Sequence, residues 1–367
     1  MRFWLYSFGL LLMPACSEPT PAADAPVPDT SAVAETPAKP VTIQTSTVLD
    51  TSGTPGPQMV RFRQTAPNGL TAEWLSYGAT LARLTLPDGT DVTASLPDNA
   101  AYAGPHNYVG ATVGPVANRI SSGQFTVGGK ACQLVTNERE NTLHCGPEGM
   151  DRLLWRGGFK PNGQLVMRHA QDAGHQGYPA ALDVEMTATL GEDFLRVSYR
   201  ATVTDPAPVN ITLHGYWNPA GVTGERVDDL FLQLPADRYT AVDADNIPTG
   251  ESPTIAGTEF DYRKARAIGI QTLDANLLIP GEGLREMARI ADGERTITVL
   301  SDYPGLQVYT GEGLSGGGLR PRSAVALEPQ YPPDAVNQPV DGEDTVLRPG
   351  EVYEHVIEFR FDGPGLP

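Results

Sequence analysis

The stretch QFTVGGKACQLV, residues 124–135, contains two runs of alternating apolar and polar residues on either side of Gly128-Gly129. Alternation with a period of two is typical of a strand with one buried face, and a glycine pair supplies the positive φ angles of a tight hairpin turn. No amphipathic helical run of three or more turns stands out. The sequence therefore predicts an all-β protein. The same alternation recurs in FLRVSYRATV (194–203), RTITVL (295–300), LQVYT (306–310) and YEHVIEFRF (353–361).

Residues 41–367 are expected to form one large domain. The chain has 367 residues, and length alone would favour about two domains. However, no second Pro- or Ser-rich linker and no change of period interrupts residues 41–367, and no repeat of fixed period indicates a propeller. Hydrophobic residues make up 40% of the chain and charged residues 19%, which is enough to bury a core. The spacing of the strands does not distinguish a barrel from a sandwich.

The N-terminal segment predicts export. Residues 3–13 are apolar, too few to span a bilayer but suited to the apolar region of a signal peptide. The segment ends in LMPAC, so residues 1–16 resemble a bacterial lipoprotein signal in which Cys16 becomes the lipidated N-terminus. The alternative is an ordinary secretory signal cut near Ala15. Either way we expect a protein of the cell envelope or periplasm, as a membrane-anchored lipoprotein in the first case.

Residues 17–40 are rich in Pro, Ala, Ser, Thr and acidic side chains. Such a composition does not repay the entropy of ordering, so we expect a disordered tether between the N-terminal segment and the domain. A tether after a lipidated cysteine would let a soluble domain stand off the membrane.

Charge and motifs argue against several classes of function. The formal net charge is −18, and no clustered basic stretch is present, so a nucleic-acid partner is not expected. After the N-terminal segment there is no apolar run of about 18 residues, so we expect membrane contact through the N-terminal anchor alone. A P-loop, a GxGxxG turn, HExxH and paired CxxC are missing from the sequence, which leaves nucleotide and structural zinc sites without support.

Two histidines lie in unusual surroundings. His144, in TLHCGPEGMDRLLW (142–155), comes between an apolar residue and a Cys-Gly-Pro turn; taken alone, it is either a structural or a catalytic histidine. His214, in VNITLHGYWNPAG, is followed by Tyr216 and Trp217. Aromatic rings beside a histidine suit a sugar, although core aromatics at a strand end are the alternative.

A carboxylate also follows an apolar run. Glu328 comes directly after AVAL, residues 324–327, where a charged side chain is not expected unless it is paired or functional. Burial raises the pKa of a carboxyl group toward the range that suits a general base. The alternative is a structural ion pair with an arginine.

Segments between residues 110 and 337 keep a distinctive order: GATVGPVANRISSGQFTVGGKACQLVTNERENTLHCGPEGMDRLLW (110–155), VNITLHGYWNPAG (209–221), RYTAVDADNIPTGE (238–251), EFDYRKARAIG (259–269) and LEPQYPPDAVN (327–337). Together they resemble the ANRI, LHGG, HxYFNLAG, IPTGE, FDFRKxxxIG and LETQ-x-PDAVN segments of the aldose 1-epimerase (galactose mutarotase) family. The resemblance implies a large antiparallel β-sandwich of the galactose mutarotase type in a single domain. It also implies interconversion of the α and β anomers of free aldohexoses such as glucose or galactose, with no metal and no organic cofactor.

The resemblance assigns roles to the three residues singled out above. Glu328 matches the general base that takes the proton from the anomeric hydroxyl. His214 matches the general acid that protonates the ring oxygen, and His144 is similar to the second histidine at that oxygen. Opening a hemiacetal requires a base at one oxygen and an acid at the other, so the chemistry agrees with the residue types.

Three further residues match groups that bind sugar hydroxyls. Asn118 and Arg119 belong to the ANRI segment, and Asp274 belongs to TLDANLLIP. The match at Asp274 departs from the family pattern, in which histidine and asparagine usually follow the aspartate, whereas this chain has Ala275 and Asn276.

Other departures flank the proposed proton-transfer residues. Cys145, Trp217, Pro219 and Pro329 stand where the family usually has Gly, Phe, Leu and Thr, so the preferred sugar stays open. We also hypothesise a disulfide between Cys132 and Cys145 in an oxidising envelope.

Two classes of function remain at this stage. The first is an exported mutarotase, and the alternative is a non-catalytic carbohydrate-binding envelope lipoprotein on the same scaffold. The presence of both an acid and a base favours the enzyme. Epimerisation of a sugar phosphate is disfavoured, because the domain is acidic and exported. The sequence leaves the oligomeric state open and assigns no role to His106, His169, His175 or His355.

Overall fold

The computed structural model describes residues 41–48, 59–104, 107–222 and 226–367. The predicted signal peptide, Cys16 and the tether of residues 17–40 lie outside the described residues. Within the described part, strands dominate and the single α-helix is the short α1 (Asn99–Ala103). Short 3-10 turns are η1 (Ser121–Gly123), η2 (Met150–Arg152), η3 (His175–Gly177) and η4 (Val227–Asp229).

The largest element is a nine-stranded antiparallel sheet. Its central strands alternate buried and more exposed residues along their whole length, as in β12 and β13, because one face of the sheet covers the core. In spatial order the sheet consists of β10 (Arg156–Phe159), β11 (Leu165–Gln171), β12 (Leu182–Leu190), β13 (Phe194–Val203), β26 (Tyr353–Asp362), β22 (Thr296–Ser301), β21 (Arg285–Ala291), β17 (Phe231–Gln233) and β19 (Arg266–Ala267).

Two smaller antiparallel sheets form the second layer. One contains β1 (Thr42–Val48), β2 (Met59–Thr65), β3 (Thr71–Leu75) and β4 (Thr80–Thr85) in sequence order. The other is five-stranded, in the order β16 (Tyr216–Trp217), β24 (Val325–Gln330), β23 (Gly305–Tyr309), β20 (Asp274–Leu278) and β18 (Arg238–Tyr239). Two-stranded ribbons complete the fold: β5 (Thr112–Val113) with β15 (Thr212–Leu213), β6 (Arg119–Ile120) with β9 (Thr142–Leu143), β7 (Gln124–Val127) with β8 (Lys130–Gln133), and β14 (Ala207–Pro208) with β25 (Val346–Leu347).

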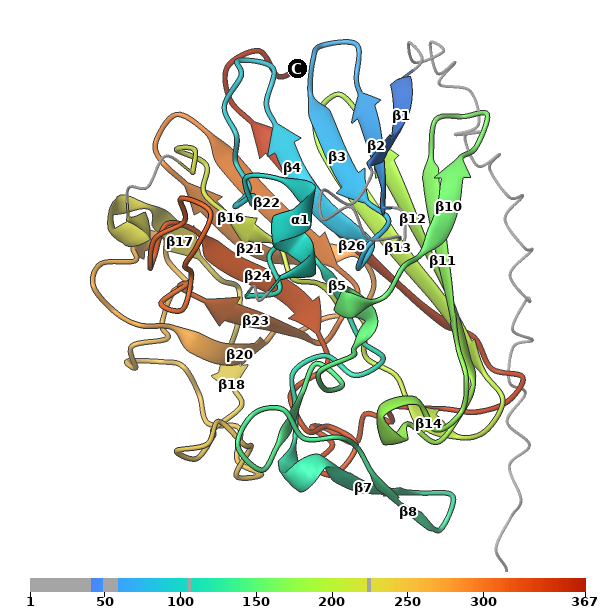
Figure 1. Ribbon diagram of the computed structural model, residues 1–367. Helices are drawn as coiled ribbons and strands as arrows, with labels where there is room; N and C mark the ends of the chain where they lie inside the picture. Colours follow the sequence, from blue (N-terminus) through green and yellow to red (C-terminus); the bar gives the residue numbers. More distant parts are fainter. Residues whose placement is uncertain (1–40, 49–58, 105–106, 223–225) are drawn as a thin grey trace, which may run out of the picture. The chain divides into compact units, whose positions relative to one another are not determined.

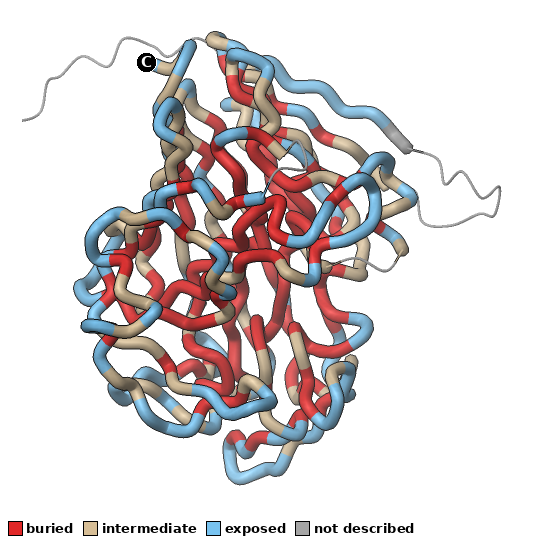
Figure 2. The backbone as a smooth tube through the Cα atoms, turned by 90° about the vertical axis from the view of Figure 1, so that its left-hand side faces the viewer, coloured by how far each residue is buried: buried red, intermediate tan, exposed pale blue. Residues whose placement is uncertain are grey.

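The two layers pack face to face around one main hydrophobic core (Figures 1 and 2). Trp217 of the five-stranded sheet packs on Phe359 of the nine-stranded sheet, with ring centroids 4.2 Å apart. Phe62 of β2 meets Phe159 of β10 edge to face at 5.7 Å. The described residues form one compact unit. The prediction of a single all-β domain with a sandwich architecture is therefore confirmed.

Local predictions from the sequence hold in detail. The strand predicted at residues 194–203 is β13, and the other three alternating runs coincide with β22, β23 and β26 within a residue or so at each end. The predicted hairpin is β7–β8, and Gly128 and Gly129 at its tip have φ angles of 56° and 75°. Two positive φ angles in succession are what a type I′ hairpin turn requires.

The hypothesised disulfide is not formed. Cys132 and Cys145 are both free thiols. The backbone N–H of Val116 donates a hydrogen bond to the buried Cys145 Sγ over 3.1 Å, whereas Cys132 lies half-buried on β8. Each sulfur has its own surroundings, so Cys145 acts as a small buried side chain.

Candidate active site

The floor of the site is the outer face of the five-stranded sheet. In β24, Val325 and Leu327 point into the main core, so the alternation of the strand turns Glu328 to the opposite face. Gln307 of β23 is the direct neighbour of Glu328 in the sheet, and Asp274 of β20 is the neighbour of Tyr309. The register of three adjacent strands therefore brings two carboxyl groups, an amide and a phenol onto one surface.

Loops from the middle of the chain form the walls. His214 follows β15 and His144 follows β9, so each imidazole leaves a short strand at its end, as predicted from the sequence. Three wall residues adopt left-handed backbone conformations, with φ of 54° at Tyr108, 65° at Asn118 and 50° at His144. Such conformations are uncommon for residues other than glycine and are concentrated at functional sites.

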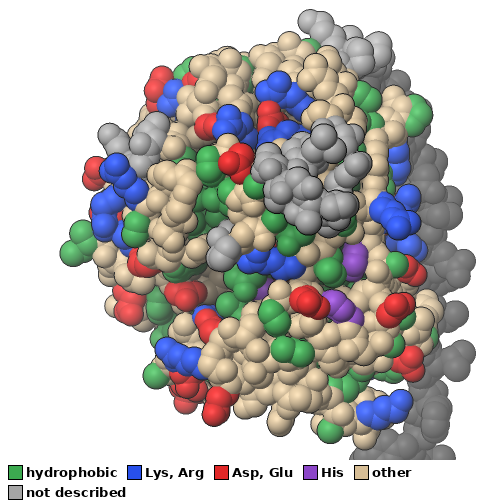
Figure 3. Space-filling view, viewed as in Figure 1, with side chains coloured by type: hydrophobic (Ala, Val, Ile, Leu, Met, Phe, Trp, Pro, Cys, Tyr) green, Lys and Arg blue, Asp and Glu red, His purple; other side chains and the backbone are tan. Residues whose placement is uncertain are grey.

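Floor and walls enclose a cavity of about 360 Å³, which is within the usual size range of a small-molecule site. Histidine side chains are visible on this face of the molecule among acidic and basic ones (Figure 3). All six residues predicted to act on or bind a sugar contribute to the lining. The full lining is Asn107, Tyr108, Asn118, Arg119, Glu138, Leu143, His144, His214, Tyr216, Asp274, Gln307, Tyr309 and Glu328.

Glu328 is a buried carboxyl group that faces the cavity, with 2% of its surface exposed. Burial raises its pKa well above the ordinary value, the Asp274 carboxyl raises it further, and Arg119 opposes the shift. Within the described part of the chain, no arginine forms an ion pair with Glu328, and its Oε2 atom has no hydrogen-bond partner. The arginine-pair alternative is therefore wrong. Its Oε1 lies 3.6 Å from Nε2 of His214, beyond a good hydrogen bond.

His144 is held as a neutral hydrogen-bond donor. The backbone N–H of Asn118 donates to its Nδ1 over 3.1 Å, so a neutral ring carries its proton on Nε2. Burial lowers the pKa of His144 well below the ordinary value, with further lowering from the charges of His214 and Arg119. The ring therefore offers an N–H group to a ligand while remaining uncharged near neutral pH.

Aromatic rings hold the two histidines in place. The His144 and His214 rings meet edge to face with centroids 5.4 Å apart. Tyr108 contacts both, at 4.4 Å and 5.7 Å, and Tyr216 lies against His214 at 4.9 Å. The two imidazoles thus form one packed wall, facing the carboxyl groups of the floor.

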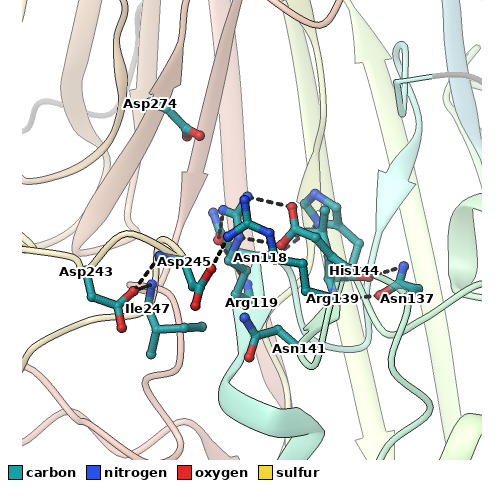
Figure 4. A network of polar contacts seen from close by, with 12 residues as sticks. Asn118, Arg119, Asn137, Arg139, Asn141, His144, Asp243, Asp245, Ile247 and Asp274 are labelled. Carbon is teal, nitrogen blue, oxygen red and sulfur yellow. Dashed lines mark hydrogen bonds and ion pairs between the residues drawn. The ribbon is translucent and has the colours of Figure 1, made fainter.

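The predicted hydroxyl-binding residues are each fixed by a neighbour. Arg119 is held by Glu138 through two hydrogen bonds, and Gln307 donates to Oδ1 of Asp274 over 2.7 Å. Figure 4 shows Asn118, Arg119 and His144 gathered together, with Asp274 standing apart on its strand. The absence of the usual histidine and asparagine after Asp274 does not remove this carboxyl group from the site.

The side-chain amide of Asn210 ties together the segments that carry the candidate catalytic groups. It accepts a hydrogen bond from the Tyr331 N–H over 3.0 Å and donates to the carbonyls of Tyr331 and Ala117 over 3.2 Å and 3.4 Å. Ala117 directly precedes Asn118, Tyr331 follows the strand of Glu328, and Asn210 itself lies shortly before His214. One buried amide therefore braces both walls against the floor.

Of the two alternatives left open for the aromatic residues after His214, Trp217 follows the core one: it is fully buried against Phe359 on the core side of β16. Tyr216, one residue earlier, takes the place in the cavity because successive side chains of a strand point to opposite faces. None of the four residues that depart from the family pattern lines the cavity.

Several lining residues were missed. Gln307 and Tyr309 lie in a run that was predicted as a strand, on the face opposite to the core residues Leu306 and Val308, where polar side chains are ordinarily expected to face solvent. Asn107, Tyr108 and Glu138 come from loops, where no periodicity marks an inward side chain. Of the histidines without an assigned role, His169, His175 and His355 do not line the cavity, and His106 lies outside the described residues.

Among the described residues, no group of three or more His, Cys, Asp or Glu side chains is arranged to hold a metal ion. The described helices include none with the length and apolar character needed to cross a membrane.

Comparison with known proteins agrees with this site. The family model described as aldose 1-epimerase matches residues 61–360. The chain is 37% identical over 313 residues to galactose mutarotase from Homo sapiens, an alignment that covers 80% of this chain and 91% of that protein. It is 33% identical over 320 residues to aldose 1-epimerase from Escherichia coli K12, covering 80% and 92%.

Solved structures give the same result. The crystal structure of galactose 1-epimerase from Lactobacillus acidophilus NCFM superposes with a TM-score of 0.79 at 25% identity, covering 88% of this chain and 99% of that one. The chain therefore belongs to the aldose 1-epimerase family. It is an enzyme, an epimerase of the mutarotase type.

Proposed function

We propose that this enzyme interconverts the α and β anomers of free aldohexoses, such as D-galactose and D-glucose, with Glu328 as general base and His214 as general acid. The observation that carries the proposal is the Glu328 carboxyl group, buried, unpaired by any described arginine and of raised pKa, opposite two imidazoles in one cavity. The name of the human relative supports galactose as a substrate.

The reaction follows from proton balance. Glu328 takes the proton of the anomeric hydroxyl, the electron pair of that O–H bond forms the aldehyde C=O, and the bond between the anomeric carbon and the ring oxygen breaks. His214 gives a proton to the departing ring oxygen, and the neutral His144 donates a hydrogen bond to it. After rotation about the bond between carbons 1 and 2, the ring closes on the other face and both proton transfers reverse.

Asn118, Arg119 and Asp274 hold the hydroxyl groups of the sugar in this proposal. An amide, a guanidinium and a carboxyl group supply both donors and acceptors, which is what a ring of hydroxyls needs. The Tyr216 ring beside His214 offers an apolar surface to the C–H face of the sugar.

Polarimetry tests the proposal. Freshly dissolved α-D-galactose and α-D-glucose should reach their equilibrium rotation faster with the purified protein than without it. Acceleration of neither sugar would contradict the proposal, and sugar binding without acceleration would favour the carbohydrate-binding alternative.

We also propose that the protein is exported and anchored to a membrane through a lipid on Cys16, with residues 17–40 as the tether. The support is the sequence pattern alone, an apolar stretch ending in LMPAC followed by a Pro- and Ala-rich segment. Cys16→Ser should move the protein from the membrane fraction to the soluble envelope fraction. Membrane association that survives this substitution would contradict the lipid anchor.

A further inference from the structure

The charges around the cavity are unbalanced. Its described lining contains three carboxyl groups, from Glu138, Asp274 and Glu328, but a single guanidinium, from Arg119. The remaining lining side chains carry amides, phenols, imidazoles or an alkyl group. Apart from an imidazole in its protonated form, Arg119 is therefore the cationic side chain that the described lining offers to an anionic ligand.

Glu138 already engages that guanidinium. Its Oε2 accepts from Arg119 Nε over 2.6 Å and its Oε1 accepts from Nη2 over 2.9 Å, a two-point pairing that matches both planar groups. The remaining Nη1 lies 3.5 Å from the Oδ1 atom of Asn118. Arg119 thus keeps N–H groups for a hydroxyl, while its charge is neutralised by a fixed carboxylate.

The turn that carries Glu138 is itself fixed. Glu138 and Asn141 exchange backbone hydrogen bonds of 3.2 Å and 2.9 Å. The Asn137 side chain accepts from the Leu143 N–H over 2.7 Å and donates to the Leu143 carbonyl over 3.0 Å, next to His144. Arg139 forms an ion pair with Asp245 of the neighbouring loop (Figure 4). The carboxylate is therefore positioned before a ligand arrives.

We propose that Glu138 is a specificity-determining residue that selects neutral aldoses and excludes anionic ones such as hexuronates. By pairing with Arg119 it neutralises the guanidinium charge that would otherwise attract a sugar carboxylate. A neutral hexose needs only the remaining hydrogen bonds, whereas the carboxylate of a hexuronate meets the Asp274 and Glu328 carboxyl groups while the Arg119 charge is already neutralised. This inference rests on the proposed function, because it names the substrate class of the same site.

A purely structural role for Glu138 makes a different prediction. If Glu138 only held Arg119 in place, its removal would weaken the binding and turnover of neutral and anionic sugars alike. If its charge selects the substrate, its removal changes the ratio between them. Glu138→Gln separates the two roles, since the amide keeps an acceptor for Arg119 and loses the charge.

The experiment compares D-galactose with D-galacturonate, which differ in charge at carbon 6. Wild type should have a higher kcat/KM for D-galactose than for D-galacturonate. Glu138→Gln should lower that preference by about tenfold or more, because the guanidinium charge is then no longer neutralised and attracts the sugar carboxylate. Glu140→Gln is the matched control: it removes one negative charge from the same turn at an exposed residue that does not line the cavity. The control should keep the wild-type ratio. Glu138→Ala should repeat the loss of preference if the glutamine variant is poorly folded.

An unchanged ratio in both Glu138 variants would overturn the proposal. Equilibrium titration gives the ratio of the dissociation constants of the two sugars, which tests the same preference without depending on turnover. Wild type that binds D-galactose in preference to D-galacturonate without accelerating mutarotation would refute the proposed function. Loss of that binding preference in Glu138→Gln would still support the role of Glu138.

Discussion

Two histidine–carboxylate pairs in this molecule, one buried and one partly buried, have opposite environments. His214 and Glu328 face the cavity with Nε2 and Oε1 3.6 Å apart, and the other oxygen of Glu328 has no hydrogen-bond partner among the described residues. His355 and Asp302 form a closer pair at 3.2 Å, and the Val356 N–H donates to the same Asp302 oxygen over 3.0 Å. The His355 ring also stacks on Tyr303 at 4.0 Å.

The two carboxyl groups respond in opposite directions. Burial raises the pKa of Glu328, whereas His355 and backbone N–H groups hold the pKa of Asp302 below its ordinary value despite burial. A paired carboxylate stabilises the fold and is a weak base, whereas an unpaired buried one costs stability and is available for proton transfer. Histidine next to a carboxylate is therefore not by itself a mark of a catalytic site; incomplete pairing on a cavity is.

The largest expected effect separates the two pairs by activity. Glu328→Gln should lower kcat by about 10²- to 10⁴-fold, the usual contribution of a general base, while sugar binding persists. Asp302→Asn should keep turnover near wild type, because Asp302 does not line the cavity. Initial rates by polarimetry measure both. A Glu328→Gln variant with the wild-type rate would contradict the assignment of Glu328 as the general base.

Loss of the His214 imidazole should have the second-largest effect on turnover. His214→Ala should lower kcat by about 10²-fold, because His144 still donates to the ring oxygen when the acid is lost. An unchanged kcat in His214→Ala would contradict the assignment of His214 and would indicate that His144 is the general acid.

Substitution of Asn210, whose amide connects the segments around the cavity, should have a smaller effect on turnover. Asn210→Asp keeps the acceptor for Tyr331 N–H but turns both donor contacts, to Ala117 and Tyr331, into contacts between oxygens. We expect kcat to fall by about tenfold through misplacement of the catalytic groups, with little change in KM. Asn218→Asp is the control, a buried amide that donates to the Ser323 carbonyl and does not line the cavity. Equal losses in both variants would mean that Asn210 is merely structural.

The smallest effect is on stability, and its sign differs between the pairs. The pKa of Glu328 is higher in the folded state than in the unfolded state. Ionisation of this group therefore lowers the free energy of unfolding as pH rises from the ordinary pKa through the folded-state pKa. Glu328→Gln should therefore raise the unfolding free energy at neutral pH, by about 1–3 kcal/mol.

Asp302 should behave in the reverse way. Its pKa is lowered in the folded state, so its stabilisation is present above the ordinary value and is lost as pH falls through the folded value. Asp302→Asn should lower the unfolding free energy by about 1 kcal/mol at neutral pH. Denaturant unfolding at neutral and acidic pH measures both variants, and shifts of the same sign would contradict the comparison.

The sequence predicted much of the site because its residues break local patterns. Glu328 after AVAL and His214 after an alternating run stand out as polar groups at the ends of apolar stretches. The hairpin of β7 and β8 and the strands β13, β22, β23 and β26 followed from period-two alternation. The sequence left open which of Tyr216 and Trp217 faces the cavity, because the two residues would exchange faces if the strand were shifted by one residue.

Contacts between distant segments were beyond the sequence. The pairing of Arg119 with Glu138 and the bridge from Asn210 to Tyr331 depend on how loops meet in three dimensions. Gln307 resembles a solvent-facing residue of an alternating strand, because nothing in its own segment indicates that loops cover that face. In the same way, the sequence around His355 does not indicate that Asp302 is its partner.

The most direct test is a carbon-13 NMR titration of the Glu328 and Asp302 side-chain carboxyl groups, assigned by their loss in Glu328→Gln and Asp302→Asn. We predict that Glu328 titrates well above its ordinary pKa of 4.5 and Asp302 below its ordinary pKa of 3.8. A Glu328 carboxyl group that titrates at or below its ordinary pKa would contradict the claim that the fold holds this residue as an incompletely paired base.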